Sequence, residues 1–185
     1  MQAERAMSCD PPGYPAHLVR ERVLRDGTPV TIRPIRPEDS GMEQAFVRHL
    51  SDDSRYFRFM GALRELPAKK LRSFTEIDYR RHMAFIATIK CEAAELEIGA
   101  ARYVATDEPG HCEFSIVIDD AWQGSGVGGM LMYSLQNAAR EQGFKIMDGI
   151  VLASNHRMLK FAKQLGFRCY HDPGEAEIVR LELRL

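Results

Sequence analysis

Residues 116–129 read Ile-Val-Ile-Asp-Asp-Ala-Trp-Gln-Gly-Ser-Gly-Val-Gly-Gly, a strand-like run that leads through glycines into an amphipathic helix. Apolar residues at positions 127, 131, 135 and 138 predict the helix, and Gly143 would end it. Glycines let a ligand approach the backbone closely, and the unpaired N–H groups of a first helical turn attract anions. Several glycines at a helix start also cost folding free energy. The turn is therefore predicted to bind a phosphate or pyrophosphate rather than only to reverse the chain.

Two ligand-binding patterns overlap in these glycines, and the first is that of dinucleotide-binding folds. Gly124-x-Gly126-x-x-Gly129 satisfies the pattern of dinucleotide-binding folds, which would indicate a nucleotide-dependent oxidoreductase. However, too few residues follow Gly129 to build the rest of such a fold. Asp148 also lies inside a predicted strand rather than at the carboxyl end, where a ribose would need it. No Gly-Lys-Ser/Thr follows the glycines, which excludes a P-loop.

Strands and helices alternate along the rest of the chain. Two strand-like runs, 18–24 and 30–35, are joined by Asp26-Gly27, a strong hairpin signal. Pro37-Glu38-Asp39 is typical of a helix start, and a second helical region spans 52–74 with a break near Gly61. Further strands are predicted at 83–89, 98–104, 113–118, 146–152 and 178–185, with an acidic hairpin around 92–97 and helices at 127–143 and 155–165. The order predicts a mixed α/β domain.

Composition limits the classes of binding partner and the cellular compartment that we expect for this protein. The 25 Lys+Arg nearly cancel the 26 Asp+Glu, for a net charge of -1, which argues against nucleic acid as a partner. The cysteines at 9, 91, 112 and 169 form no Cys-x-x-Cys pair, so we expect reduced thiols in a cytoplasmic protein, without a disulfide or a metal. No stretch approaches the roughly 18 apolar residues of a membrane span. Residues 1–15 are expected to be a flexible tail without a signal peptide. Residues 16–185 are expected to form one domain, and the sequence does not determine its oligomeric state.

A second pattern, Gln123-x-x-Gly126-x-Gly128, is the signature of acetyl-CoA-binding N-acetyltransferases, and the chain resembles this GNAT superfamily from about residue 30 to 185. The segments 155–158 (Asn-His-Arg-Met) and 165–167 (Leu-Gly-Phe) resemble the family's asparagine-led helix and its ending. The resemblance implies an α/β (α+β) fold with a mixed, mostly antiparallel sheet flanked by helices and split between the fourth and fifth family strands. The strand before the glycine turn would carry a bulge, and the pantetheine arm would enter the split.

Two earlier segments indicate which subgroup of the superfamily the chain resembles. Residues 54–60 (Ser-Arg-Tyr-Phe-Arg-Phe-Met) and 77–79 (Ile-Asp-Tyr) resemble the catalytic domain of bacterial protein-lysine acetyltransferases. The implied reaction is direct transfer of an acetyl group from acetyl-CoA, the co-substrate, to a primary amine, with a protein lysine as the favoured acceptor. A small amine, a peptide N-terminus and a catalytically silent acetyl-CoA sensor remain open alternatives.

The resemblance also assigns residues to the cofactor. Backbone groups of Val117 and Ile118 would hold the pantetheine. Asn155 would either contact the cofactor or only cap its own helix. Met158 and Phe161 would either line the path of the cofactor or only pack in the core. The pyrophosphate would be cradled by Gln123, Gly124, Ser125, Gly126, Val127, Gly128 and Gly129.

The reaction needs a base, because a lysine amine with a pKa of about 10.4 arrives protonated. Glu113 is the candidate that the resemblance implies, on the strand face of Ser115 and Val117, and the alternative is an exposed acid at a strand end. A backbone N–H near Val117 or Ile118 would stabilise the oxyanion. Many family members have a tyrosine acid where this chain has Ala162, and no residue is assigned that role. His111 is interpreted as a lone surface histidine.

Overall fold

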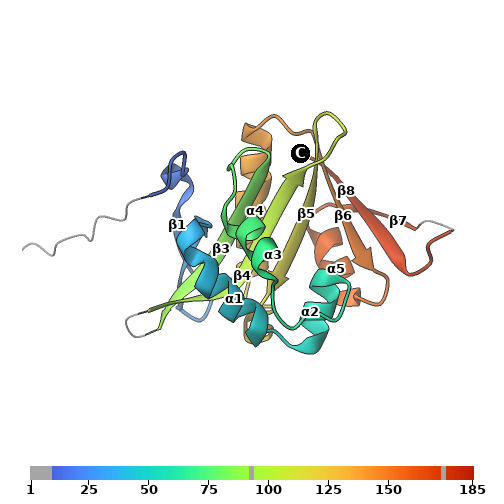
Figure 1. Cartoon of the computed structure of the whole chain (residues 1–185). Coiled ribbons are helices and arrows are strands. Elements are labelled where there is room, and N and C mark those ends of the chain that lie inside the picture. The colour runs from blue at the N-terminus through green and yellow to red at the C-terminus, as the bar shows by residue number, and fades with distance from the viewer. Residues whose placement is uncertain (1–9, 92–93, 172–173) are drawn as a thin grey trace, which may run out of the picture.

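The structure, a computed structural model, describes residues 10–91, 94–171 and 174–185 (Figure 1). One sheet contains eight strands in the order β1-β2-β3-β4-β5-β6-β8-β7. The strands are β1 (Arg20–Val23), β2 (Pro29–Pro34), β3 (His82–Cys91), β4 (Ala94–Ala105), β5 (His111–Ile118), β6 (Ile146–Leu152), β7 (Arg168–His171) and β8 (Ile178–Arg184). The helices are α1 (Ser40–His49), α2 (Asp52–Phe59), α3 (Ala68–Thr75), α4 (Val127–Glu141) and α5 (His156–Gln164). Among these described strands, only β5 and β6 pair in parallel, which confirms the mixed, mostly antiparallel sheet.

β5 and β6 separate soon after they begin (Figure 1). Their parallel pairing covers three residue pairs, the last of which joins Glu113 to Asp148. β5 then continues to Ile118, whereas β6 pairs along its whole length with β8 on its other side. The sheet is therefore split where the resemblance places the split, between the fourth and fifth family strands.

The bulge expected on the strand before the glycine turn is absent from β5, and that expectation is wrong. β5 pairs with β4 in continuous register from Cys112 to Ile118. The register shift of this region lies instead between β3 and β4, at Ala87 and Thr88. The split arises because β6 follows β8 and leaves β5, with no extra residue needed in β5.

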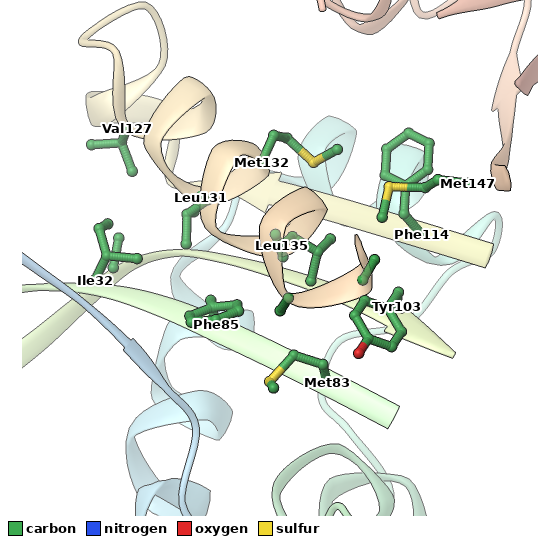
Figure 2. Packing of buried hydrophobic residues seen from close by; sticks show 14 of the residues in the cluster. Ile32, Met83, Phe85, Tyr103, Phe114, Val127, Leu131, Met132, Leu135 and Met147 are labelled. Carbon is green, nitrogen blue, oxygen red and sulfur yellow. The ribbon is translucent and has the colours of Figure 1, made fainter. Parts of the chain in front are cut away.

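α4 covers one face of the sheet with the predicted apolar stripe. Val127, Leu131 and Leu135 are fully buried, and Figure 2 shows these residues turned toward side chains of the strands, Phe85 and Tyr103 among them. Burying a leucine contributes about 1.5–3 kcal/mol, so this stripe fixes where the start of α4 lies on the sheet. The core under α4 continues to α5 through Ala162 and its neighbours.

The helices α1 and α3 pack on the opposite face, over β3 and β4. Phe46 and Val47 of α1 are buried with Ala84 and Ile86 of β3 in a second cluster. On the same face, farther along the sheet, Ile150 of β6 is 39% exposed. Beside the split, the face of the sheet on the α1 side is therefore more exposed to solvent than the face that α4 covers.

The structure differs from the predicted elements in two places. β7 has no counterpart among the predicted strands, because Arg168–His171 lacks an alternating apolar pattern. It is a strand because β8 offers an edge, on which Tyr170 pairs with Arg180. Glu97 belongs to the expected acidic hairpin, but the strands extend past it and bury it inside β4. The predicted break in the second helical region is confirmed, since α2 ends at Phe59 and the next residue, Met60, is left-handed with φ of 51°.

The N-terminal tail is described in part. Residues 1–9 lie outside the described residues, but Tyr14 donates its hydroxyl hydrogen to the Pro34 carbonyl (3.1 Å) and packs edge-on against Tyr79. Across residues 10–91, 94–171 and 174–185, no helix has the length and apolar character to cross a bilayer. In those ranges the cysteines are free thiols, and no group of His, Cys, Asp and Glu could hold a metal ion.

Candidate functional site

The glycine turn presents free backbone N–H groups at the start of α4. Gly124 and Gly126 have φ angles of 84° and 103°, where L side chains are strained, so both positions favour glycine. The helical ladder opens with the N–H of Met130, which donates to the Gly126 carbonyl at 3.2 Å. Within the described residues, no acceptor is found for the N–H groups of Gly124, Gly126, Gly128 and Gly129. Free donors at the positive end of a helix dipole are what a phosphate-binding turn requires.

Gly128 and Gly129 lie inside the first turn of α4 rather than in the loop before it. A Cβ on Gly128 would come within 3.2 Å of Cζ of Phe161, so this glycine lets α5 approach α4 closely. Phe161 packs against the core, as its alternative interpretation had it. Gly129 has open space around it, and together with Gly126 it borders a cavity of about 480 Å³.

The side chain of Gln123 holds the turn from three sides. Its Nε2 donates to the Ile118 carbonyl and to Oγ of Ser54, each at 3.2 Å. Its Oε1 accepts a hydrogen bond from the guanidinium of Arg157 on α5. The end of β5, helix α2 and helix α5 are therefore joined through this one amide.

Asp120 braces the same region, although the sequence patterns did not single it out. Its carboxylate accepts from the N–H of Ser51 (2.9 Å) and from the hydroxyls of Ser51 (2.8 Å) and Ser54 (2.7 Å). Burial alone would raise the pKa of Asp120, but these hydrogen bonds hold that pKa below its ordinary value. Ser51 followed by two aspartates is a helix-capping pattern that could have indicated the first half of this contact.

The backbone of β5 faces the split at alternate residues. The N–H of Asp119 donates to the Ile98 carbonyl at 2.9 Å, so that this pair belongs to the hydrogen-bonded set of the antiparallel ladder. By alternation, the backbone groups of Val117 point toward β4 and those of Ile118 and Ile116 point into the split. The Ile118 carbonyl agrees with this, because it accepts from Gln123. Of the two residues predicted to hold pantetheine, Ile118 turns its backbone into the split, where its N–H faces a ligand, whereas the backbone groups of Val117 point toward β4.

Glu113 lies at the apex of the split. It is exposed, and it is the last β5 residue that pairs with β6. Its neighbours Cys112 and Phe114 are buried under α4, so Glu113 projects from the opposite face with Ser115. The candidate base and the backbone of Ile118 therefore belong to the same strand, five residues apart.

Asn155 caps α5, as one of its two interpretations had it. Its Oδ1 accepts the N–H of Met158 at 3.0 Å, which satisfies one of the orphan donors of that helix. Met158 is half-buried and packs against the main core. The cap uses only the side-chain oxygen of Asn155, and contact between its amide nitrogen and the cofactor stays a prediction.

A family model supports the interpretation of this geometry. The model of the acetyltransferase (GNAT) family matches residues 46–167, a range that contains Glu113, the glycine turn and α5. The chain belongs to the GNAT acetyltransferase family. It is therefore an acyltransferase enzyme, and its sheet, antiparallel apart from one strand pair, excludes the dinucleotide-binding fold that Gly124, Gly126 and Gly129 would also fit.

Curated relatives and solved structures agree with this assignment. The chain is 38% identical over 162 residues to acetyltransferase PA5475 of Pseudomonas aeruginosa, covering 88% of this chain and 87% of that one. It is 29% identical to acetyltransferase Pat of Mycolicibacterium smegmatis, over 77% of this chain but only 42% of Pat. The crystal structure of the GNAT domain of S. lividans PAT superposes with a TM-score of 0.85 at 32% identity, covering 93% of this chain and 99% of that one.

The resemblance to GNAT enzymes implies a tyrosine acid at the position that Ala162 occupies in this chain. Ala162 is fully buried between α5 and the sheet, so this helix position offers the reaction no proton donor. A thiol with a pKa near 8.5 can leave as its anion, so acyl transfer does not require such a donor.

A buried charged cluster lies under α1, on the face of the sheet from which Glu113 projects. Arg102 of β4 pairs with Glu43 of α1 at 3.3 Å and donates to the Phe74 carbonyl at 3.1 Å. Glu97 is 2% exposed, and neither of its carboxyl oxygens meets a donor among the described residues. Burial and the neighbouring Glu43 raise the pKa of Glu97 well above its ordinary value. Burial, with the charge of Arg102, also lowers the pKa of Arg58 to about 10.

The raised pKa of Glu97 predicts a stability that falls with pH. The folded state binds one more proton than the unfolded state between the ordinary pKa, about 4.3, and the raised one. Unfolding free energy should therefore decrease as the pH rises through this window, by at most about 1.4 kcal/mol per pH unit. Glu97→Gln should flatten this slope and be the more stable protein at pH 8, whereas the exposed control Glu76→Gln should follow the wild type. Urea unfolding at several pH values measures this, and equal slopes for wild type and Glu97→Gln would contradict it.

Proposed function

We propose that this GNAT enzyme uses acetyl-CoA as its acetyl donor and transfers the acetyl group directly to the ε-amine of a protein lysine. The observation that carries the donor assignment is the set of free N–H groups at Gly124, Gly126, Gly128 and Gly129, at the end of a strand whose far edge opens into the split. A diphosphate fits the free amides, and an extended pantetheine arm fits the open edge of β5.

The chain's own residues supply three functions in this transfer. The N–H of Ile118 or Ile116, which faces the split, would donate to the oxyanion as the amine adds to the thioester carbonyl. Glu113, through a water molecule, would take the proton that the attacking amine must lose. The carbon–sulfur bond then breaks and the sulfur leaves as a thiolate, with the acetyl group now on nitrogen.

A polypeptide acceptor is supported by exposed apolar side chains on elements around the split. Tyr56 on α2 is 50% exposed, Ile150 on β6 is 39% exposed and Tyr170 on β7 is 44% exposed. Ile150 and Tyr170 belong to one row of the sheet, because each pairs with Arg180 of β8. Exposed aromatic side chains suit a protein segment better than a small amine. The resemblance at residues 54–60 and 77–79 supports the same acceptor.

Ligand-dependent melting tests the donor. Acetyl-CoA at 100 times its dissociation constant should add about 2.7 kcal/mol to the folded state, which for a chain of this size raises Tm by about 5–10 °C. NAD at the same concentration should leave Tm unchanged. Stabilisation by NAD and not by acetyl-CoA would overturn the proposed donor.

Acetyl transfer to the components of a cell lysate tests the proposed acceptor. Isotope-labelled acetyl-CoA with wild-type protein should label lysine side chains of proteins, identified by mass spectrometry. Label on small amines or on protein N-termini alone would assign the alternative acceptors. A protein that binds acetyl-CoA and labels nothing would instead be an acetyl-CoA sensor, in line with the alanine at position 162.

A further inference from the structure

Three cations gather around one pair of aromatic rings on the α1 face of the sheet. The rings of Phe59 and Phe74 are stacked, with their centroids 6.5 Å apart. The guanidinium carbon of Arg102 lies 3.7 Å from the centroid of the Phe74 ring. On Phe59, the guanidinium carbon of Arg58 lies 5.0 Å and the ammonium nitrogen of Lys70 lies 4.9 Å from the ring centroid. Aromatic faces attract cations, so the two rings hold the three charges close together.

Two of these three cations lack an anionic partner. Arg102 pairs with Glu43 and donates to the Phe74 carbonyl. Within the part of the chain that the structure describes, neither the Arg58 guanidinium nor the Lys70 ammonium meets a hydrogen-bond acceptor or an ion-pair partner. Both side chains are half-buried, and burial, with the charges of Arg58 and Arg102, lowers the pKa of Lys70. Neighbouring cations without a counter-ion cost free energy that a bound anion would recover.

The cluster lies beside the candidate base. Arg102 of β4 pairs with Ser115 of β5, and Glu113 projects from the same face two residues before Ser115. Arg102 and Glu113 are therefore diagonal neighbours, which lie about 7–8 Å apart in an antiparallel pair. The charge of Glu113 also favours the charged form of Arg58. An acceptor polypeptide whose lysine reaches Glu113 therefore passes within reach of the Arg58 guanidinium.

The anion that fits this cluster belongs to the acceptor rather than to the donor. The free amides proposed for the diphosphate open α4, which covers the opposite face of the sheet from α1 and α3. A guanidinium that lies over an aromatic ring keeps its N–H edge for a carboxylate, which it can bind through two parallel hydrogen bonds. A second cation beside it favours a full negative charge over the dipole of a carbonyl group.

We propose that Arg58, with Lys70 beside it, is a specificity-determining residue that binds the side-chain carboxylate of an aspartate or glutamate close to the target lysine of the acceptor. This inference rests on the proposed function, since it names which protein lysines the same site selects. No bond forms or breaks at Arg58, and the lysine amine still loses its proton to Glu113. An acid two or three residues from the lysine lies about 7–10 Å along an extended chain, which matches the spacing of the cluster and the base.

The experiment measures the preference of the enzyme for an acidic neighbour of the target lysine. Its acceptor is a protein labelled in the lysate experiment, in which glutamate or glutamine is placed singly at each position within about four residues of the labelled lysine. For the wild type, the kcat/KM ratio of glutamate to glutamine should reach about ten at one position or more, and it should fall as salt is added. This ratio should drop to about one in Arg58→Gln and to about three in Lys70→Gln.

Lys69→Gln is the matched control, because Lys69 is the exposed neighbour of Lys70 on α3, and it should keep the wild-type ratio. A ratio taken within one variant is insensitive to a general loss of activity. If Arg58 were only structural, Arg58→Gln would slow both acceptors equally and keep the ratio. Should Arg58→Gln not fold, Lys70→Gln carries the test.

Two results would overturn the inference and leave the proposed function standing. One is a wild-type ratio near one at every position, and the other is a wild-type preference that both Arg58→Gln and Lys70→Gln retain. A lysate in which the wild type labels no protein lysine would instead overturn the proposed function.

Discussion

Glu113→Gln is expected to lower kcat/KM for amine acetylation by about 10²–10³ while the dissociation constant of acetyl-CoA changes by less than about twofold. The substitution keeps the size of the side chain and removes its ability to take a proton. Glu113 is exposed and contributes no core contact, so the fold should be unaffected. The loss should appear in kcat, because the base acts on the amine in the transition state and not on the bound donor.

The matched control is Glu177→Gln, at an exposed glutamate outside the split. It should retain wild-type rates, which separates a specific loss from a general effect of removing a negative charge. Steady-state rates of thiol release at several amine concentrations, together with calorimetric binding of acetyl-CoA, provide both readouts. Full activity in Glu113→Gln would show that another group takes the proton.

Gly126→Asp is expected to weaken acetyl-CoA binding by about 10²-fold or more, the second large effect. A side chain at Gly126 meets no atom within 4 Å, but its φ of 103° strains any L residue there, so part of the loss is backbone strain. Beyond that strain, the substitution puts a carboxylate at the free N–H groups. Repulsion between that carboxylate and the diphosphate would account for the rest of the loss.

Gly143 provides the control for backbone strain, because it too has a positive φ, 86°, and a Cβ placed on it would meet no atom within 4 Å, but it follows the other end of α4. Gly143→Asp should bind acetyl-CoA like the wild type. Gly126→Asn, which has nearly the same shape without the charge, should lose much less affinity than Gly126→Asp. Isothermal titration calorimetry compares the three, and equal affinity of Gly126→Asp and wild type would show that the diphosphate binds elsewhere.

The turn and its helix could be predicted from the sequence because their causes are local. A run of glycines before the stripe Val127, Leu131 and Leu135 has the same meaning in any surrounding, and the structure buries that stripe as predicted. The hairpin at Asp26-Gly27 and the alternating strand β8 were predictable for the same reason. Glu97 escaped prediction, because an acidic residue near a turn gives no sign that neighbouring strands will bury it.

Local sequence is thus sufficient for the short-range chemistry: free amide donors at residues 124–129, a glutamate on one strand face, and a chain order that predicts a mixed α/β domain. Tertiary packing, by contrast, set which distant groups meet. It placed Asp148 and His111 at the apex beside Glu113, turned the backbone of Ile118 rather than Val117 into the split, and brought Ser51 and Ser54 onto Asp120. The physical reason is that strand order and register depend on the summed packing of the whole core, whereas turns and helix stripes depend on a few neighbouring residues.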